Sequence, residues 1–112
     1  MALKNVIRAV PLSVIDTASF GAGYIAFDAL PAACTLIRII NDSDVGVTIS
    51  YDGGTTEHDY VIAGKTAELD FQANSGPGNY PAGFPQGLVI SANGDAGTGD
   101  VYLAAYYQPQ GV

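Results

Sequence analysis

The sequence is poor in charged residues, and basic residues are the scarcest of all. Only 13% of its 112 residues are charged, about half of the ~25% that is usual in globular proteins. Four Lys and Arg stand against eleven Asp and Glu, which gives a net charge of −7. The shortage of basic residues argues against binding to nucleic acid and against docking on anionic membranes. The acidic balance suits a surface that repels its own copies or one that meets a basic partner.

Cysteine and histidine, which often build metal and thiol sites, occur once each. A single cysteine allows no disulfide within the chain, and Cys34 lies in an apolar stretch typical of a buried small residue. His58 lies between Glu57 and Asp59, a setting in which histidine can be a metal ligand or a general base. It has no Cys or His partner at ligand spacing, however, and adjacent strand residues point to opposite faces. We therefore expect no metal, no cofactor and no catalytic residue.

Three further arrangements give only weak signals for a chemical site. Five aspartates could supply oxygen ligands to Ca²⁺, but their spacing does not match an EF-hand, and aspartate is common in turns. They are Asp42, Asp44, Asp52, Asp95 and Asp100. The glycine-rich stretches 21–23 and 94–99 lack the following helix that a phosphate-binding loop requires. Ser13, Asp16 and His58 could be imagined as a hydrolase triad, but no nucleophile-elbow motif accompanies them. The sequence therefore predicts a protein that is not an enzyme.

Helical patterns and long apolar runs are also missing. No window places apolar residues at helical spacing with a capping signal and without an interrupting Gly or Pro. No apolar run approaches the ~20 residues that span a bilayer, and residues 1–5 do not resemble a signal peptide. We therefore expect a chain that is made in a cytoplasm.

The sequence contains instead a period-two alternation of apolar and polar residues, most clearly between Leu36 and Phe71. Such alternation indicates strands with one buried and one solvated face. Polar turns are expected at 41–44 and 52–56, a tight turn at 63–65, and a turn with several positive-φ positions at 93–99. Besides an N-terminal edge strand, the expected strands are 24–27, 36–40, 45–51, 60–62, 66–72, 88–92 and 101–107.

This pattern predicts an all-β protein, a single antiparallel β-sandwich of about eight short strands, jelly-roll-like and without substantial helix. Residues 1–23 hold short apolar bursts separated by Pro11, and they are interpreted as an extended N-terminal arm or edge strand. Residues 24–112 form the β-sandwich domain. The arm either pairs with the edge of its own sheet or adds a strand to a neighbouring chain.

The last expected strand is apolar on both of its faces. Tyr102 and Tyr106 share one face, opposite the face of Val101 and Leu103. Either this strand is central in the sandwich, or its second face meets another chain, since tyrosine is enriched in interfaces. The candidate interface comprises these two tyrosines, two residues of the arm and two of the Pro- and Gly-rich loop 73–86. Its members are Tyr102, Tyr106, Val6, Ile7, Tyr80 and Phe84.

Three segments, taken in order, resemble small structural proteins of tailed bacteriophages. They are LIRIINDSDVGVTISYDG at 36–53, HDYVIAG at 58–64 and AGTGDVYLAAY at 96–106. The N-terminal arm lies outside the resemblance. The resemblance implies a virion component, such as a capsid decoration or cement protein, a collar protein or a tail accessory protein. It implies no catalytic residues.

On this resemblance we expect a non-enzymatic structural protein of the virion, made in the cytoplasm of a bacterial host. The leading hypothesis is a capsid decoration or cement protein that forms a homo-oligomer and staples neighbouring capsid subunits. Its partners would be the major capsid protein or other virion proteins. The alternative is a collar or tail accessory protein, or a module that recognises a host receptor such as a glycan. In that case the loop with Tyr80 and Phe84 and the exposed tyrosines would form the binding surface.

Overall fold

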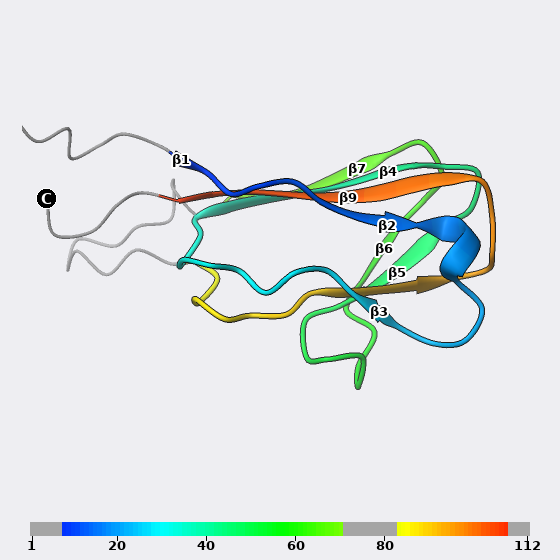
Figure 1. Ribbon diagram of the computed structural model, residues 1–112, viewed down its shortest axis with the longest axis horizontal. Coiled ribbons are helices and arrows are strands. Elements are labelled where there is room, and N and C mark those ends of the chain that lie inside the picture. The colour runs from blue at the N-terminus through cyan, green and yellow to red at the C-terminus, as the bar shows by residue number, and fades with distance from the viewer. Residues whose placement is uncertain (1–7, 71–82, 108–112) are drawn as a thin grey trace, which may run out of the picture.

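The computed structural model describes residues 8–70 and 83–107, and these form two antiparallel sheets packed face to face (Figure 1). Sheet A contains β1 (Arg8–Ala9), β2 (Ser13–Asp16), β4 (Leu36–Ser43), β7 (Thr66–Asp70) and β9 (Gly99–Tyr107). Sheet B contains β3 (Ile25–Ala26), β5 (Val47–Ser50), β6 (Asp59–Val61) and β8 (Ser91–Gly94). The described residues include one short 3₁₀ turn, η1 (Thr17–Ser19).

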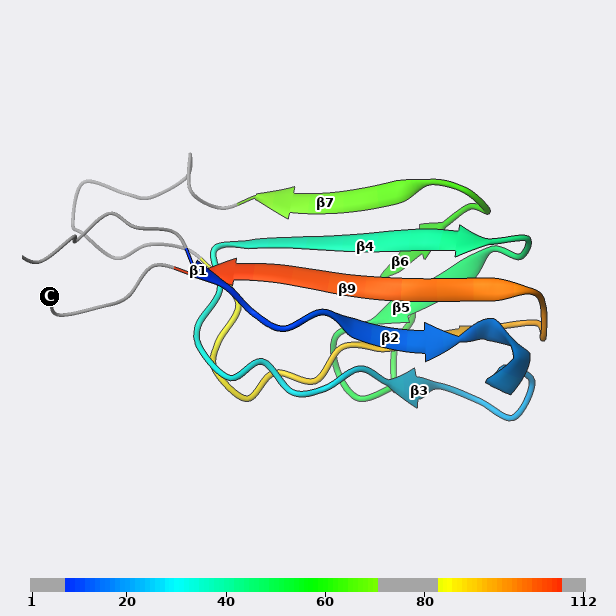
Figure 2. The same cartoon turned by 45° about the horizontal axis from the view of Figure 1, so that its top comes forward.

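The strand order within the two sheets is that of a jelly roll. In sheet A, β9 lies between β4 and the edge formed by β1 and β2, and β7 lies beyond β4 (Figure 2). In sheet B the order is β3-β8-β5-β6. This interleaving of two four-strand arrays is that of a double-sheet jelly roll, with β1 and β2 sharing one position. The predicted all-β, jelly-roll-like sandwich without substantial helix is confirmed.

No helix in the described part of the chain is long and apolar enough to cross a membrane.

The core lies between the two sheets and follows from the alternation of the strands. Ile37 and Ile39 point inward from β4 and are fully buried, as are Val47 and Ile49 from β5. Fully burying one such side chain contributes about 1.5–3 kcal/mol to folding. Cys34 is also fully buried, which confirms its interpretation as a small core residue.

Pro11 interrupts the edge strand of sheet A. Ala9 lies opposite Tyr106, whereas Ser13, four residues later, lies opposite Leu103, only three residues earlier on β9. One extra residue is therefore accommodated between β1 and β2, as in a β-bulge, at a residue that has no N–H to donate. Residues 8–16 thus pair with the edge of their own sheet, while the first seven residues lie outside the described range.

The turn predicted at Asn41–Asp44 is wrong, because β4 continues to Ser43. Asn41 is buried inside the strand, and its Nδ2 donates hydrogen bonds to the carbonyls of Val45 (2.8 Å) and Val61 (3.0 Å). Its backbone N–H donates to Lys65 O (2.9 Å), its carbonyl accepts from Gly64 N (3.0 Å), and its Oδ1 accepts from the Ser43 hydroxyl, so the polar groups of Asn41 are satisfied. Tertiary contacts therefore outweigh the turn preference of the residue.

The strand predicted at 88–92 is displaced, because β8 covers Ser91–Gly94. Leu88 instead belongs to a loop in which its backbone carbonyl accepts from Leu30 N (3.0 Å) and its N–H donates to Pro85 O (3.2 Å). The turn predicted at 93–99 is correspondingly shorter. Gly99, at the start of β9, has the expected positive φ of 109°.

Candidate functional site

The outer face of sheet A carries two groups of apolar and aromatic residues. Tyr106 of β9 lies opposite Leu36 of β4. Four residues earlier on β9, Tyr102 lies between Ile40 of β4 and Val14 of β2. We call this set the tyrosine face; its members are Val14, Leu36, Ile40, Tyr102 and Tyr106. Cross-strand neighbours on one face are in contact range, so Leu36 and Tyr106 form one group, and Val14, Tyr102 and Ile40 form a second.

The tyrosine face is only partly covered within the chain. Leu36, Ile40, Tyr102 and Tyr106 are half-buried, and Val14 is 50% exposed. The opposite face of the same strand, with Val101 and Leu103, is buried in the core. β9 is therefore central in its sheet, and its outer face, which carries Tyr102 and Tyr106, is also partly open to solvent. Both of the alternatives weighed from the sequence thus remain compatible with the placement of β9.

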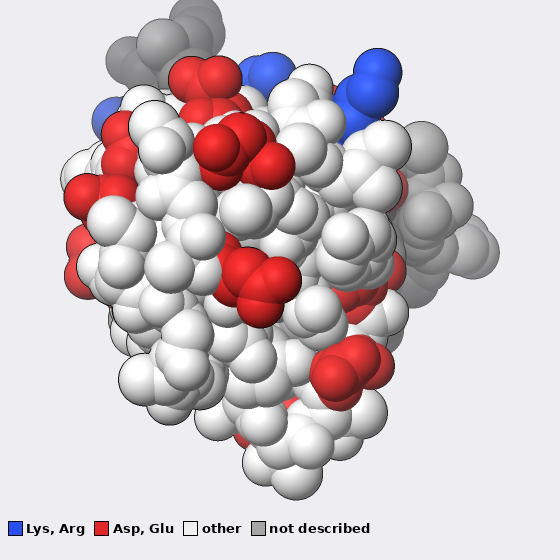
Figure 3. All heavy atoms as spheres, turned by 90° about the vertical axis from the view of Figure 1, so that its right-hand side faces the viewer, with Lys and Arg blue, Asp and Glu red and all other residues white. Residues whose placement is uncertain are grey.

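An acidic row borders the tyrosine face where the strands reach the end of the sandwich. Asp100 of β9 lies directly between Asp16 of β2 and Asp42 of β4. Figure 3 views this end of the molecule, where acidic side chains outnumber basic ones. The charge of Asp100, followed by burial, raises the pKa of Tyr102, whose hydroxyl lies 3.4 Å from Asp100 Oδ2. The row therefore gives one border of the face a negative potential.

An ion pair joins β4 to β7 in the same sheet. Arg38 Nε lies 3.6 Å from Glu68 Oε2, and both side chains are substantially exposed. Exposed pairs of this kind contribute about 0–1 kcal/mol to stability. The position of the pair matters more than its energy. Arg38 lies between Leu36 and Ile40 and opposite Ala104, so it divides the tyrosine face into two apolar halves.

The other predicted interface residues lie elsewhere. Phe84 is half-buried and packs against the core, and its backbone pairs with that of Cys34 through bonds of 2.7 and 2.8 Å. Its ring also stacks on Tyr51, with centroids 6.0 Å apart. Val6, Ile7 and Tyr80 lie outside the described residues. The structure thus brings Tyr102 and Tyr106 together on one face and places Phe84 away from it.

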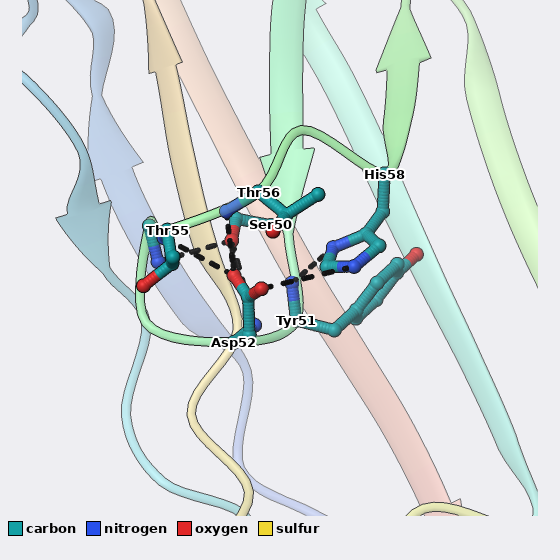
Figure 4. Close-up of polar contacts among 7 residues, drawn as sticks. Ser50, Tyr51, Asp52, Thr55, Thr56 and His58 are labelled. Atoms are coloured by element: carbon teal, nitrogen blue, oxygen red, sulfur yellow. Dashed lines mark hydrogen bonds and ion pairs between the residues drawn. The ribbon is translucent and has the colours of Figure 1, made fainter.

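The only histidine of the chain lies in a polar turn between β5 and β6 (Figure 4). Asp52 Oδ1 accepts from Ser50 Oγ (2.7 Å), Thr55 N (3.1 Å) and Thr56 N (2.9 Å). These bonds, with that of Ser50 the strongest, hold the pKa of Asp52 well below its usual range. His58 Nδ1 accepts from the backbone N–H of Tyr51 (3.0 Å), and its Nε2 lies 4.0 Å from Asp52 Oδ2.

This serine, aspartate and histidine are not connected as a catalytic relay. In a triad the serine hydroxyl donates to histidine, which in turn donates to the carboxylate. Here Ser50 donates to Asp52, and His58 Nδ1 is an acceptor of a backbone bond. Ser50 is also fully buried. The arrangement fixes the turn, in the way that aspartate side chains commonly cap their own backbone.

The other candidate catalytic and metal-binding residues lie far apart in the fold or already take part in hydrogen bonds. Ser13 and Asp16 lie on sheet A, whereas His58 lies in the turn between two strands of sheet B. Asp44 Oδ1 accepts from Thr98 N (2.8 Å). Within residues 8–70 and 83–107, no group of three or more His, Cys, Asp or Glu side chains is placed to hold a metal ion. Burial raises the pKa of the Cys34 thiol, which disfavours the reactive thiolate.

Alternation along one strand was enough to place Tyr102 and Tyr106 on one face, but not to find the acidic row. Asp100 is two residues from Tyr102, and Asp42 is two from Ile40, so both could have been assigned to the tyrosine side. Asp42 and Asp100 are neighbours only because of the β4–β9 register. This register places residue 42 opposite residue 100, which is 58 positions away in sequence.

Comparison with protein-family models finds no match to this chain, and no curated protein is similar to it at a significant level.

Proposed function

We propose that the protein is a non-enzymatic structural component of a bacteriophage virion, a decoration protein that binds neighbouring capsid subunits through the tyrosine face. The observation that carries this proposal is the in-register apolar surface of Leu36, Tyr106, Ile40, Tyr102 and Val14 on the outside of sheet A. Tyrosines that are half-exposed on a rigid sheet are well suited to an interface core, because they bury much area at little cost in conformational entropy.

The acidic row supports a partner surface that carries basic residues. Asp16, Asp42 and Asp100 stand side by side at one border of the tyrosine face. A charged border around an apolar centre is the usual anatomy of an interface, and it sets orientation and association rate more than affinity. The proposed partner is therefore a major capsid protein, or another virion protein, that presents an apolar patch beside Lys or Arg.

Two further considerations agree with this role. The double-sheet jelly roll is an architecture used in viral capsids, although the fold alone does not define a function. The three motif segments that resemble phage structural proteins lie on strands of both sheets and on their turns. Stapling adds contact area at each junction between subunits, so the protein would act in the assembled virion, as a homo-oligomer.

The first experiment is to measure the mass of the protein by light scattering, alone and with capsids of the virus that encodes it. We expect saturable binding to the shell. A Tyr102→Ala/Tyr106→Ala double variant should bind at least about 30-fold more weakly, because even one aromatic hot spot at an interface centre contributes ~2 kcal/mol or more. Ile62→Ala, which truncates an exposed apolar residue (52%) outside the tyrosine face, is the matched control.

Raising the salt concentration should slow association if the acidic row meets basic residues. A protein that remains monomeric and ignores capsids would contradict the proposal. Equal binding by the double variant and by wild type would show that the tyrosine face is not the contact. Binding to isolated tails in place of capsids would favour the collar or tail accessory role.

A further inference from the structure

The outer face of sheet B is hollowed, in contrast to the tyrosine face. One hollow of about 390 Å³ lies over strands β5, β6 and β8 and the glycine-rich bend before β3. Its lining consists of Gly21, Gly23, Gly46, Thr48, Tyr60, Asn93, Gly94 and Asp95. A second hollow of about 480 Å³ adjoins it and shares Thr48 and Tyr60 with it. The two hollows therefore form one open trough, with Tyr60 between them.

Tyr60 extends into this trough. A Cβ placed on Gly46 would collide with its Oη and Cζ, so the hydroxyl end of the ring lies against the Gly46 backbone, just before β5. Tyr60 is nevertheless 64% exposed, the largest exposure among the large hydrophobic residues of the described chain. The ring is thus held at its hydroxyl end and is mostly open to solvent. An exposed, supported aromatic ring is a platform for stacking, not a core residue.

Polar side chains stand in register beside this platform. Thr48 of β5 lies between Tyr60 of β6 and Asn93 of β8. Asn93 Oδ1 accepts from the N–H of Gly94 (2.9 Å), which leaves the two amide N–H groups at the other end of the side chain. Asp95 follows directly and is exposed. The trough thus combines one aromatic surface with a hydroxyl, an amide and a carboxylate, the combination by which small polar ligands are oriented.

The charge of the trough restricts the class of ligand. Asp95 lines the first hollow, and Glu57 and Asp59 line the second, whereas neither lining contains Lys or Arg. An anionic ligand such as a phosphate or a uronic acid would therefore be repelled. Carboxylates accept hydrogen bonds, so they complement a ligand rich in hydroxyl donors and without negative charge.

We infer that the outer face of sheet B binds an uncharged oligosaccharide, with one sugar ring stacked on Tyr60 and its hydroxyls bonded to Thr48, Asn93 and Asp95. The apolar C–H face of a pyranose suits the negatively polarised face of an aromatic ring. The trough extends on both sides of Tyr60, so it accepts more than one sugar unit. This inference goes beyond the proposed function and uses the opposite sheet, so capsid binding and sugar binding can fail separately.

The test is calorimetric titration of the full chain with neutral hexasaccharides of glucose, N-acetylglucosamine and mannose at millimolar concentration. Hexagalacturonate is the anionic comparison. We expect at least one neutral hexasaccharide to saturate a single site, and hexagalacturonate to bind about tenfold more weakly or not at all. Absence of binding by all the neutral hexasaccharides, or preferential binding of hexagalacturonate, would overturn the inference.

Variants locate the site. Tyr60→Ala should weaken binding about tenfold, because stacking contributes ~1 kcal/mol or more beyond burial, while Tyr60→Phe should retain most of the affinity. Gly46→Ala should also weaken binding, because the new Cβ displaces the ring. Leu12→Ala, at an exposed residue (55%) of the chain segment next to sheet A, is the control. Thermal melts verify that each variant is folded. Equal affinity in wild type, Tyr60→Ala and Gly46→Ala would overturn the site.

Discussion

The two sheets are alike on the inside and different on the outside. Both inner faces are built from buried β-branched and small residues, such as Ile37 of β4 and Ile49 of β5. Outside, sheet A is an aromatic surface bordered by acidic residues, whereas sheet B is a polar trough with glycine in its floor. The inner faces are constrained by packing, so the outer faces are where two sheets of one sandwich can acquire separate tasks.

Strand length accounts for part of this difference. β4 and β9 are eight and nine residues long and pair over eight positions, which provides a broad, regular surface. The strands of sheet B have two to four residues. Short strands end in turns and glycines, and these bring loops over the sheet and leave hollows between them.

The largest effect on stability is expected when the hydrogen bonds of Asn41 that join the two sheets are removed. Asn41 of sheet A donates to the carbonyls of Val45, at the turn into β5, and of Val61, at the end of β6. Asn41→Leu would remove both of these buried hydrogen bonds, together with the acceptor of the Ser43 hydroxyl, so we expect a loss of about 3 kcal/mol in the free energy of unfolding. Urea denaturation measures it.

The matched control is Asn93→Leu, which places the same substitution on the outer face of sheet B. Its expected change is within about 0.5 kcal/mol, as for surface positions in general. A similar loss in both variants would show that Asn41 has no special role in joining the sheets.

A smaller effect is expected from acidification of the turn between β5 and β6. The pKa of Asp52 is lowered in the folded state, mainly by the Ser50 hydroxyl and the Thr56 N–H. Its stabilisation is therefore complete above the ordinary carboxyl pKa of about 4 and is lost as pH falls below that value. Asp52→Asn should be less stable than wild type at neutral pH, and the difference should narrow in acid. A difference that is constant with pH, measured by urea midpoints, would contradict this.

The smallest expected effect is a change in tyrosine pKa that differs between Tyr102 of sheet A and Tyr51, which follows β5 of sheet B. The charge of Asp100 is the main cause of the raised pKa of Tyr102, whereas burial is the main cause for Tyr51. Salt at 1 M screens charges beyond ~3 Å but does not change burial. We expect high salt to lower the pKa of Tyr102 more than that of Tyr51, to whose shift the charge of Asp59 contributes least, as followed by NMR titration. Asp100→Asn should reproduce the effect of salt on Tyr102 alone.

The fold was predictable to the extent that local pattern determines it. Alternation correctly located the strands around Leu36, Val47 and Val101, and Pro11 correctly marked an interruption of the edge. Asn41–Asp44 was misassigned, because its turn-forming residues extend β4 in response to contacts with β5 and β6. Propensity describes a residue in isolation, and it fails where a distant carbonyl supplies the partner.

The surfaces were predictable only along a strand, not across strands. Tyr102 and Tyr106 could be placed on one face from their spacing, but the acidic row requires the register of three strands. The importance of Tyr60 was missed for a similar reason. Its sequence neighbours indicate an ordinary short strand, whereas the place of its ring depends on Gly46, which comes just before the neighbouring strand β5.

The single thiol of the chain, Cys34, can report on opening of the sandwich. Cys34 is fully buried and is held by backbone pairing with Phe84, so a thiol reagent can reach it only when that part of the protein opens. The rate of labelling therefore measures the free energy of opening in the unmodified chain. Because the chain has no other cysteine, the labelling rate of Cys34 reports opening at one known position, and it can be compared between the free and the assembled protein.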